Sequence, residues 1–286
     1  MNDFFILNVK IPKYIFLMVI WFTACGSHND PFSWVETIPD PWTLSQIEFE
    51  SFLPQFQKRF PNYHDRLKAL NLWRVGTPYG IFCLGEESGK DTDPLLRADS
   101  SDCTVHVLTT IAFAESYTWQ NARDAMVDIH YKMHENGEKK PTYKSRWHYT
   151  SDRLLHHEQT VDITSIVATE NELEKIEIEL NKKEDGSEFL DLNWSSNETI
   201  YYIPTEKVTE KLLMNLPSVC GVAFVKRKYF KMGIVIAHEG YLIDQTNLIH
   251  ASSEFGETVQ AVFLDYLFKN GETRFDGVMF YNINPM

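Results

Sequence analysis

Cysteine is scarce in this sequence, whose 286 residues include only four: Cys25, Cys83, Cys103 and Cys220. This density is far below that of small scaffolds built on disulfides, and no two of the cysteines form a Cys-x-x-Cys pair. A disulfide framework is therefore excluded, and each cysteine has to be interpreted from its own surroundings. Cys83 and Cys220 stand among apolar residues, which predicts that both are small core side chains.

Basic residues are also in the minority. The chain has 27 Lys and Arg against 40 Asp and Glu, which gives a formal net charge of −13. An acidic surface repels phosphate backbones, and glycine-rich phosphate loops of the Walker or Rossmann type are absent, so we expect no nucleic-acid partner. The one basic cluster, Lys226-Arg-Lys228 with Lys231, is either a solvated loop or strand edge, or a docking patch for carboxylate groups.

The apolar run near the N-terminus is too short to cross a membrane. Residues 14–22 form an unbroken stretch of nine apolar side chains, whereas a helix that spans a bilayer needs about 20 residues. Lys10 and Lys13 precede this run, and small residues follow it. A basic start, a short apolar stretch and small residues before a cleavage point are the parts of a secretory signal.

The residues after this run, Phe22-Thr-Ala-Cys25, resemble the bacterial lipobox. The resemblance implies that residues 1–24 are a lipoprotein signal peptide and that acyl chains on Cys25 anchor the protein to a membrane. The alternative is an ordinary signal peptide followed by a chance cysteine. Without residues 1–24 the chain keeps 25 basic and 39 acidic residues, a formal charge of −14, so the acidity belongs to the folded part.

The rest of the chain predicts a flexible tether over residues 25–45 and a single α+β domain over residues 46–286. Apolar residues recur with helical or alternating spacing, and no internal repeat divides the domain. The expected helices cover residues 42–72 with a break at Pro61, 103–114, 119–133 and 256–268. The expected strands cover residues 176–180, 219–225, 232–237, 248–251 and 277–281.

Cys103 is the first candidate for chemistry, because Asp102 is a possible N-cap and Cys103 would open an apolar helix. The N-terminus of a helix carries partial positive charge, which favours a thiolate and makes the cysteine a better nucleophile. The alternative is a buried structural cysteine, which is a common role for this residue type.

A thiolate nucleophile requires a base nearby, and histidine is the usual one. His250 stands in an apolar strand, Leu248-Ile-His-Ala-Ser-Ser253, where an imidazole needs a partner or a task. His106 lies one helical turn after Cys103 and could contact the thiol, although such neighbours more often pack. His148, His156 and His157 raise the question of a metal, but no HExxH or Cys-His ligand spacing is present, so we expect no metal and no cofactor.

Several motifs, taken in order, resemble the N-acetylmuramoyl-L-alanine amidase-like branch of the NlpC-type papain-like amidases. They span about residues 70–268, nearly all of the expected domain. The motifs are Gly76-Thr-Pro-Tyr79, Leu84-Gly-Glu86, Asp93-Pro-Leu95, Arg97, Asp102-Cys-Thr104, Arg146-Trp-His-Tyr-Thr-Ser-Asp152, Tyr202-Ile-Pro204, Gly233-Ile-Val235 and Leu248-Ile-His-Ala-Ser-Ser253.

This resemblance implies a papain-like NlpC fold, in which an antiparallel sheet packs against an N-terminal helical part and the nucleophilic cysteine begins a helix. It also implies cleavage of the amide between the muramyl lactyl group and L-alanine in peptidoglycan fragments. Cys103 would then be the nucleophile and His250 the residue that orients the base. The substrate-binding residues would be Tyr79, Asp102, Arg146, His148 and Tyr149.

One position departs from the family pattern. The family carries its base in His-Val-Gly-Ile, and the sequence Lys231-Met-Gly-Ile234 places a lysine there. A lysine of normal pKa is protonated and cannot accept the thiol proton, unless burial lowers its pKa. His238 is seven residues further on, an odd offset that directs it to the other face of a regular strand, and only a β-bulge would bring it back.

The sequence thus predicts a monomeric lipoprotein of the bacterial cell envelope, periplasmic or on the surface side, which cleaves muropeptides as a cysteine amidase. A second hypothesis is a catalytically silent protein of the same fold that binds muropeptides, because Lys231 replaces the expected base. A third is a structural lipoprotein with no ligand, which requires a closed apolar environment around Cys103.

Overall fold

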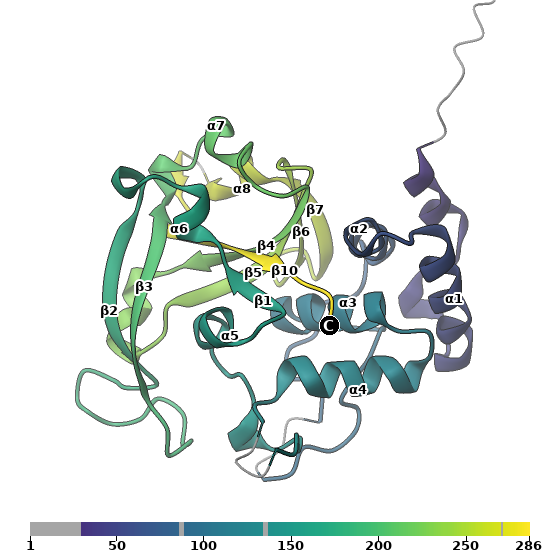
Figure 1. Cartoon of the computed structure of the whole chain (residues 1–286), viewed down its shortest axis with the longest axis horizontal. Helices are drawn as coiled ribbons and strands as arrows, with labels where there is room; N and C mark the ends of the chain where they lie inside the picture. Colours follow the sequence, from purple (N-terminus) through teal and green to yellow (C-terminus); the bar gives the residue numbers. More distant parts are fainter. Residues whose placement is uncertain (1–29, 86–88, 134–136, 270) are drawn as a thin grey trace, which may run out of the picture.

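An antiparallel sheet and a group of helices form the two halves of this protein, as the computed structural model shows (Figure 1). The structure describes residues 30–85, 89–133, 137–269 and 271–286. Cys25 and the expected signal peptide therefore lie outside the described residues. In the described part of the chain, no helix is both long and apolar enough to cross a membrane.

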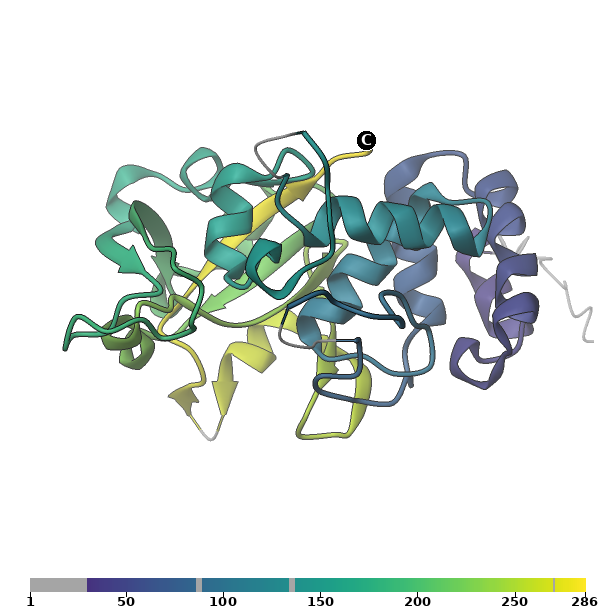
Figure 2. The same cartoon turned by 90° about the horizontal axis from the view of Figure 1, so that it is seen from below.

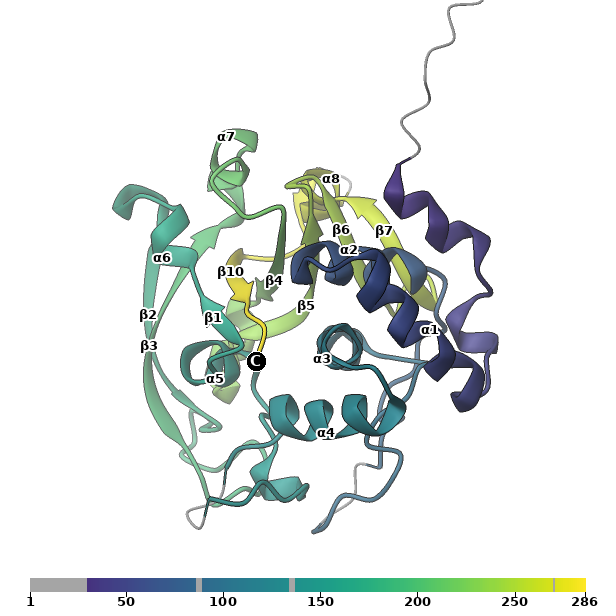
Figure 3. The same ribbon diagram turned by 45° about the vertical axis from the view of Figure 1, so that its right-hand side comes forward.

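The four long helices cluster on one side of the sheet, with α3 between the sheet and α4 (Figure 2 and Figure 3). They are α1 (Gln46–Arg59), α2 (Tyr63–Trp73), α3 (Cys103–Glu115) and α4 (Trp119–His130). Shorter helices are α5 (Thr150–His156), α6 (Thr164–Val167), α7 (Glu210–Leu213) and α8 (Phe263–Leu267). The 3₁₀ turns are η1 (Pro31–Thr37), η2 (Pro41–Thr43), η3 (Tyr143–Ser145), η4 (Glu170–Glu172), η5 (Thr205–Lys207) and η6 (Arg227–Met232).

The described strands form one sheet of eight and a separate pair, β8 (Phe268–Lys269) with β9 (Glu272–Thr273), and every strand pairing is antiparallel. The large sheet has the order β2-β3-β10-β4-β5-β6-β7, with β1 paired to β10. Its strands are β1 (Thr160–Asp162), β2 (Glu174–Leu180), β3 (Ser196–Pro204), β4 (Val219–Val225), β5 (Ile236–Ile243), β6 (Asn247–Ser252), β7 (Glu257–Val262) and β10 (Gly277–Ile283).

Most of the expected helices and strands are present, and the predictions for two segments are wrong. The break at Pro61 separates α1 from α2, where Asn62 caps α2 by accepting hydrogen bonds from two backbone N–H groups. The expected strand over residues 232–237 is instead the end of η6 followed by the start of β5. The expected helix over residues 256–268 is mostly β7, whose β-branched Thr258, Val259 and Val262 suit a strand better than a helix.

The described structure includes two 3₁₀ turns, η1 and η2, upstream of the predicted domain boundary at residue 46. Phe32 stacks on Phe60 with ring centroids 5.3 Å apart, and Trp34 packs edge-on against Phe56 at 5.0 Å. The indole N–H of Trp73 donates to the carbonyl of Pro39. Residues 31–43, which the sequence places in a tether, therefore pack against α1 and α2.

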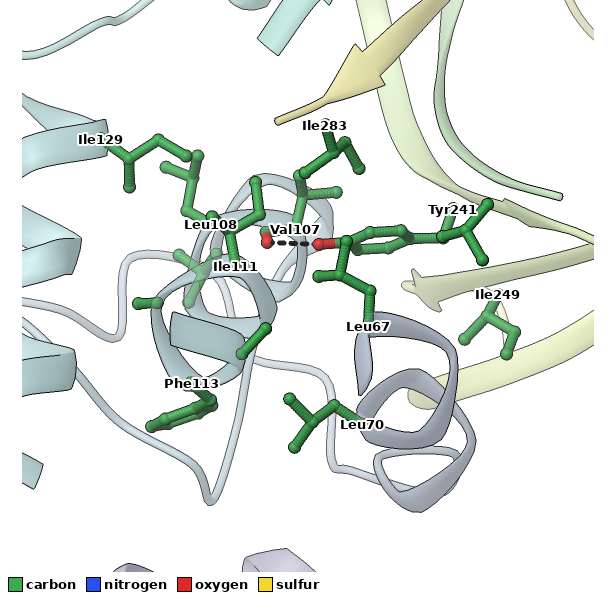
Figure 4. Packing of buried hydrophobic residues seen from close by; sticks show 14 of the residues in the cluster. Leu67, Leu70, Val107, Leu108, Ile111, Phe113, Ile129, Tyr241, Ile249 and Ile283 are labelled. Carbon is green, nitrogen blue, oxygen red and sulfur yellow. Dashed lines mark hydrogen bonds between the residues drawn. The ribbon is translucent and has the colours of Figure 1, made fainter. Parts of the chain in front are cut away.

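Alternating side chains of the central strands separate two apolar cores. In β4, Ala223 and Val225 face the core shared with the long helices, whereas Val222 and Phe224 face the core on the opposite side of the sheet, which also contains Phe263 of α8. Because both faces are covered, every residue of β4 is buried. Figure 4 shows α3 in the first core, where the Tyr241 hydroxyl donates to the Val107 carbonyl at 2.9 Å.

A buried carboxylate, that of Glu239 in β5, joins the two halves of the protein. It forms an ion pair with Arg153 of α5 at 2.6 Å, and each side chain is 1% exposed. It also accepts hydrogen bonds from Thr104 of α3 (2.9 Å), Thr150 of α5 (3.0 Å) and Tyr281 of β10 (2.9 Å). A buried charge is tolerated only when it is paired and hydrogen-bonded, so these elements are fixed relative to one another around this carboxylate.

Replacing Glu239 with Gln keeps the shape of the side chain but leaves the Arg153 guanidinium buried without its anion. We expect the free energy of unfolding in urea to fall by about 3–5 kcal/mol, the usual loss when one partner of a buried ion pair is removed. Glu177→Ala, which breaks an exposed pair with Lys175, is the matched control and should leave the midpoint of urea unfolding unchanged. Equal midpoints for the two variants would contradict this role of Glu239.

Candidate active site

Cys103 occupies the first position of α3, as the sequence predicts. Asp102 is the N-cap and accepts a hydrogen bond from the backbone N–H of Val105 at 2.8 Å. The next residue, Thr104, donates to Glu239 and so ties this end of the helix to β5. The thiol is half-buried and free of any disulfide. Local capping and the Glu239 carboxylate thus hold the cysteine at the junction of helix and sheet.

The electrostatic surroundings of Cys103 differ from those predicted for a helix N-terminus. Burial raises the pKa of the thiol to about 12, and the carboxylates of Asp102 and Glu239 contribute to this rise. The helix N-terminus favours a thiolate, but at this position desolvation and two acidic neighbours outweigh it. At neutral pH the resting cysteine is therefore a protonated thiol.

A β-bulge in β5 brings His238 to the cavity that Cys103 lines. Along β4, Phe224 pairs with His238 and Val225 pairs with Ile236, so Ala237 is an extra residue in β5. An extra residue reverses the alternation of side chains between the faces of a strand. The expectation that His238 faces away from the site is therefore wrong, because it assumed a regular strand. Cys103 and His238 line the same cavity of about 170 Å³.

His250, in β6, contacts His238 directly. The Nε2 atom of His238 and the Nδ1 atom of His250 are 2.8 Å apart, a hydrogen-bond distance. Aromatic rings surround the pair: Phe224 stacks on His238 with centroids 5.5 Å apart, and Tyr266 contacts His250 at 4.6 Å. Burial lowers the pKa of His238, and the neighbouring His250 and Arg274 lower it further. Burial lowers the pKa of His250 as well, so both imidazoles are neutral at neutral pH.

The hydrogen bond between the two histidines determines which nitrogen could serve as a base. Because Nε2 of His238 is engaged with His250, only its Nδ1 atom is left to accept a proton. Nδ1 has a free lone pair only in the tautomer whose Nε2–H donates to Nδ1 of His250. In that arrangement His250 carries its own hydrogen on Nε2 and accepts the hydrogen bond from His238 through Nδ1.

Lys231 lies in η6, exposed, and does not line the cavity that contains Cys103. The sequence predicts that Lys231 directly precedes a strand over residues 232–237. In the structure β5 begins only at Ile236, so Lys231 lies in the 3₁₀ turn before it. The sequence does contain a signal for the histidine: His238-Glu239-Gly240 repeats the family's His-x-Gly spacing, seven residues after the lysine. The rest of the basic cluster is also at the surface, where Arg227 pairs with Glu174 at 2.6 Å.

The cavity walls come from segments that are distant in sequence. Thr104, His148, Tyr149, Thr150 and Ser151 form much of one side, as the sequence predicts for the segment from Arg146 to Asp152. An apolar part, which the sequence reasoning missed, is lined by Phe189, Leu190, Ile234, Ile236 and Ala237. The cavity lining therefore combines polar and apolar side chains, and Cys103 does not lie in a closed apolar environment.

Asn181 organises the loop that carries Phe189 and Leu190. Its backbone is in the left-handed region (φ 63°), and its side chain is fully buried. The Oδ1 atom accepts from the Tyr149 hydroxyl (2.6 Å) and from the Leu190 N–H (2.7 Å), while Nδ2 donates to the carbonyls of Leu190 and Trp194. One amide thus fixes the loop against the wall of the cavity.

The other predicted substrate-binding residues differ in accessibility. Tyr79 is half-buried, and its pKa is raised first by burial and then by its neighbours Cys103 and Asp102, so it borders the site. Arg146 is buried and pairs with Asp91. His148 is half-buried, and one of its ring nitrogens (Nε2) lies 2.5 Å from the Tyr143 carbonyl.

The remaining candidates lie outside this cavity. His106 is a buried residue of α3, and its imidazole contacts Asn71 of α2, so it packs rather than reaching the thiol. Cys220 is buried, as predicted, but Cys83 is half-exposed, which is contrary to the prediction of a core position.

Away from the cavity, the structure brings together three side chains whose donor atoms are of the kinds that bind metals. Donor atoms of Asp152, His156 and Glu198 lie within 4.8 Å of one another. Lys132 already forms an ion pair with Asp152, and His156 contacts Glu198 at 3.0 Å. These contacts are accounted for by ion pairing alone, and we assign no metal to the group.

The protonation state of Cys103 can be tested by alkylation with iodoacetamide, which reacts with thiolates. Because the pKa of the thiol is raised, we expect slow modification at pH 7 and a rate that rises about tenfold per pH unit well beyond pH 9. Peptide mass spectrometry separates Cys103 from the half-exposed Cys83, which serves as an internal control. Asp102→Asn should speed modification at pH 8, because it removes a carboxylate that raises the pKa of the thiol. A modification rate that has already reached its plateau at pH 7 would contradict a thiol that is protonated in the free protein.

Comparison with known proteins shows where this architecture recurs. A protein from Legionella pneumophila of the DUF1460 family has a TM-score of 0.65 and 21% identity, covering 82% of this chain and 94% of its own. An N-acetylmuramoyl-L-alanine amidase from Bacteroides uniformis has a TM-score of 0.59 and 18% identity, covering 78% and 99%. A Bacteroides fragilis protein named as a candidate xylanase has a TM-score of 0.58 and 20% identity, covering 75% and 99%.

Identities this low show a shared fold of helices and antiparallel sheet, and the differing names of these proteins show that fold alone does not assign the chemistry. No curated protein matches the sequence significantly. A family model described as AmiA-like, N-acetylmuramoyl-L-alanine amidase-like, matches residues 72–273. That range covers most of the chain and includes Cys103, His238 and His250, so the chain belongs to the AmiA-like family of N-acetylmuramoyl-L-alanine amidase-like proteins.

Proposed function

We propose that this protein is a cysteine amidase that cleaves the amide between N-acetylmuramic acid and L-alanine in peptidoglycan fragments. The observation that carries the proposal is the convergence of Cys103 with a hydrogen-bonded His238–His250 pair at one cavity. A nucleophile, a base and a residue that orients the base are the three parts that acyl transfer requires. The amidase-like family supplies the substrate class.

The reaction begins with the neutral pair. As the Cys103 sulfur attacks the lactyl carbonyl carbon, its proton passes to Nδ1 of His238, and the hydrogen bond from Nε2 to His250 steadies the imidazolium. His238 then gives this proton to the departing nitrogen of L-alanine, which leaves a thioester on Cys103 and releases the peptide. Water, deprotonated by His238, hydrolyses the thioester and regenerates the thiol.

The low pKa of His238 suits the second half of this cycle. An imidazolium in an apolar, aromatic surrounding is a strong acid, so it protonates the amine leaving group readily. The raised pKa of the thiol disfavours the first step, the attack of Cys103 on the carbonyl, because the sulfur gives up its proton less readily. Substrate binding therefore has to draw the thiol and imidazole together before attack.

One observation favours a second candidate, a silent muropeptide-binding protein. Within the residues that the structure describes, no hydrogen bond joins the Cys103 sulfur to an imidazole. Catalytic hydrogen bonds are often long in ligand-free enzymes and shorten in the complex, so this geometry is compatible with both functions. The lysine at position 231 no longer distinguishes them, because it lies outside the cavity.

Cleavage of a defined muropeptide, followed by mass spectrometry, separates the two functions. Wild-type protein should release the free peptide. We expect Cys103→Ala to release none, and His238→Ala to reduce the rate by about 10²- to 10⁴-fold, the usual contribution of a general base. Lys231→Ala is the matched control and should keep the wild-type rate, because it changes an exposed side chain outside the cavity.

Two outcomes of this experiment would revise the proposal. Loss of cleavage in Lys231→Ala with retention in His238→Ala would show that the base has been misassigned. Binding of the muropeptide by wild-type protein without any release would establish the silent binder instead.

We further propose that the protein works in the bacterial cell envelope as a lipoprotein anchored through Cys25, as a monomer on the periplasmic or surface side. The lipobox-like sequence and the location of peptidoglycan support this placement. A test is the fractionation of cells that express the full chain: wild type should partition with membranes, and Cys25→Ala should appear in the soluble fraction. Retention of Cys25→Ala with membranes would refute the lipid anchor.

A further inference from the structure

A second, smaller cavity adjoins the one that contains Cys103. Its volume is about 60 Å³, and it shares His148 and Tyr149 with the larger cavity. About 10–15 Å³ of such space is enough to hold one water molecule, so this cavity has room for several waters or for a group of carboxylate size. The two cavities therefore meet at the segment that carries His148 and Tyr149.

Three cationic side chains, Lys132, Lys144 and Arg146, line this second cavity together with one acidic side chain, Asp152. Cations thus outnumber anions in this lining, although the net charge of the chain is −13. A local excess of positive charge attracts an anion although the whole molecule repels it. This cationic lining lies beside His148 and Tyr149, whereas the basic cluster around Lys231 lies elsewhere on the surface.

Two of these cations already have carboxylate partners. Lys132 pairs with the buried Asp152, and its ammonium lies 3.9 Å from the centroid of the Trp194 ring. Arg146 pairs with the buried Asp91. These contacts hold both side chains in place, so the positive lining of the cavity is pre-organised.

Lys144 is the third cation, and it differs from the other two. It is exposed in η3, and no carboxylate pairs with it among the residues that the structure describes. An ammonium at the mouth of a cavity is available to a ligand without breaking an internal ion pair. A carboxylate group has the charge and the size that this space accepts.

We propose that this cavity is a subsite for a carboxylate of the peptide part of the substrate, with Lys144 as the side chain that captures it. The inference rests on the proposed function, since it places the peptide on the Tyr149 side of the scissile amide. It makes the protein selective for muropeptides whose peptide carries a free carboxylate near the cleaved bond, and it disfavours those in which that group is a carboxamide.

The test compares two muropeptides that differ only in whether this carboxyl group is free or converted to the carboxamide. Their binding to Cys103→Ala protein, full chain, is measured by calorimetry, so the result does not depend on cleavage. We expect the free acid to bind about tenfold more tightly, the usual value of one charge-assisted hydrogen bond. Adding Lys144→Ala should abolish this preference, and adding Lys140→Ala should not.

Lys140 is the matched control because it is an exposed lysine four residues away that pairs with Glu138 and does not line this cavity. In protein that keeps Cys103, Lys144→Ala should raise KM for the free acid about tenfold and leave kcat unchanged. A preference that survives Lys144→Ala, equal binding of the two muropeptides, or binding of neither would overturn the subsite. Preferential binding without cleavage would uphold the subsite and overturn the proposed amidase.

Discussion

The Glu239 carboxylate is the contact on which the geometry of the site depends. It is buried in the sheet, yet it reaches α3 through Thr104 and α5 through Thr150 and Arg153. Cys103 and His238 are the chain neighbours of Thr104 and Glu239. The contact that joins helix to sheet therefore also positions Cys103 relative to His238, and this carboxylate is one cause of the raised pKa of the thiol.

The site thus combines helices and a sheet held together by Glu239 with a free state in which the thiol and both imidazoles are uncharged. The aromatic surroundings keep His238 and His250 neutral, and desolvation keeps the thiol protonated. A neutral pair does not require a buried ion pair in the free protein, and in the proposed reaction charge develops only when a substrate is attacked. The loop fixed by Asn181 and the hydroxyl of Tyr149 shape the wall of the cavity that Cys103 lines.

Much of this arrangement could be predicted from the sequence, because the decisive signals are local. The N-cap Asp102 and the apolar run after it indicate α3, with Cys103 at its start, and Pro61 separates α1 from α2. The strand β4 follows from an unbroken apolar run. The site residue His250 could be selected because an imidazole in an apolar strand needs a partner, and His238 is that partner.

What the sequence determined by itself is therefore the family, the main elements and the position of Cys103 at the start of α3, since these depend on short-range patterns and ordered motifs. Tertiary structure alone brought His238 to the cavity that Cys103 lines. Whether His238 or a neighbouring position faces Cys103 depends on one extra residue, Ala237, in the pairing of β5 with β4. A strand's alternation reverses at such a bulge, and its position is set by pairing between strands rather than by the local sequence. Partners distant in sequence likewise decided the role of Glu239.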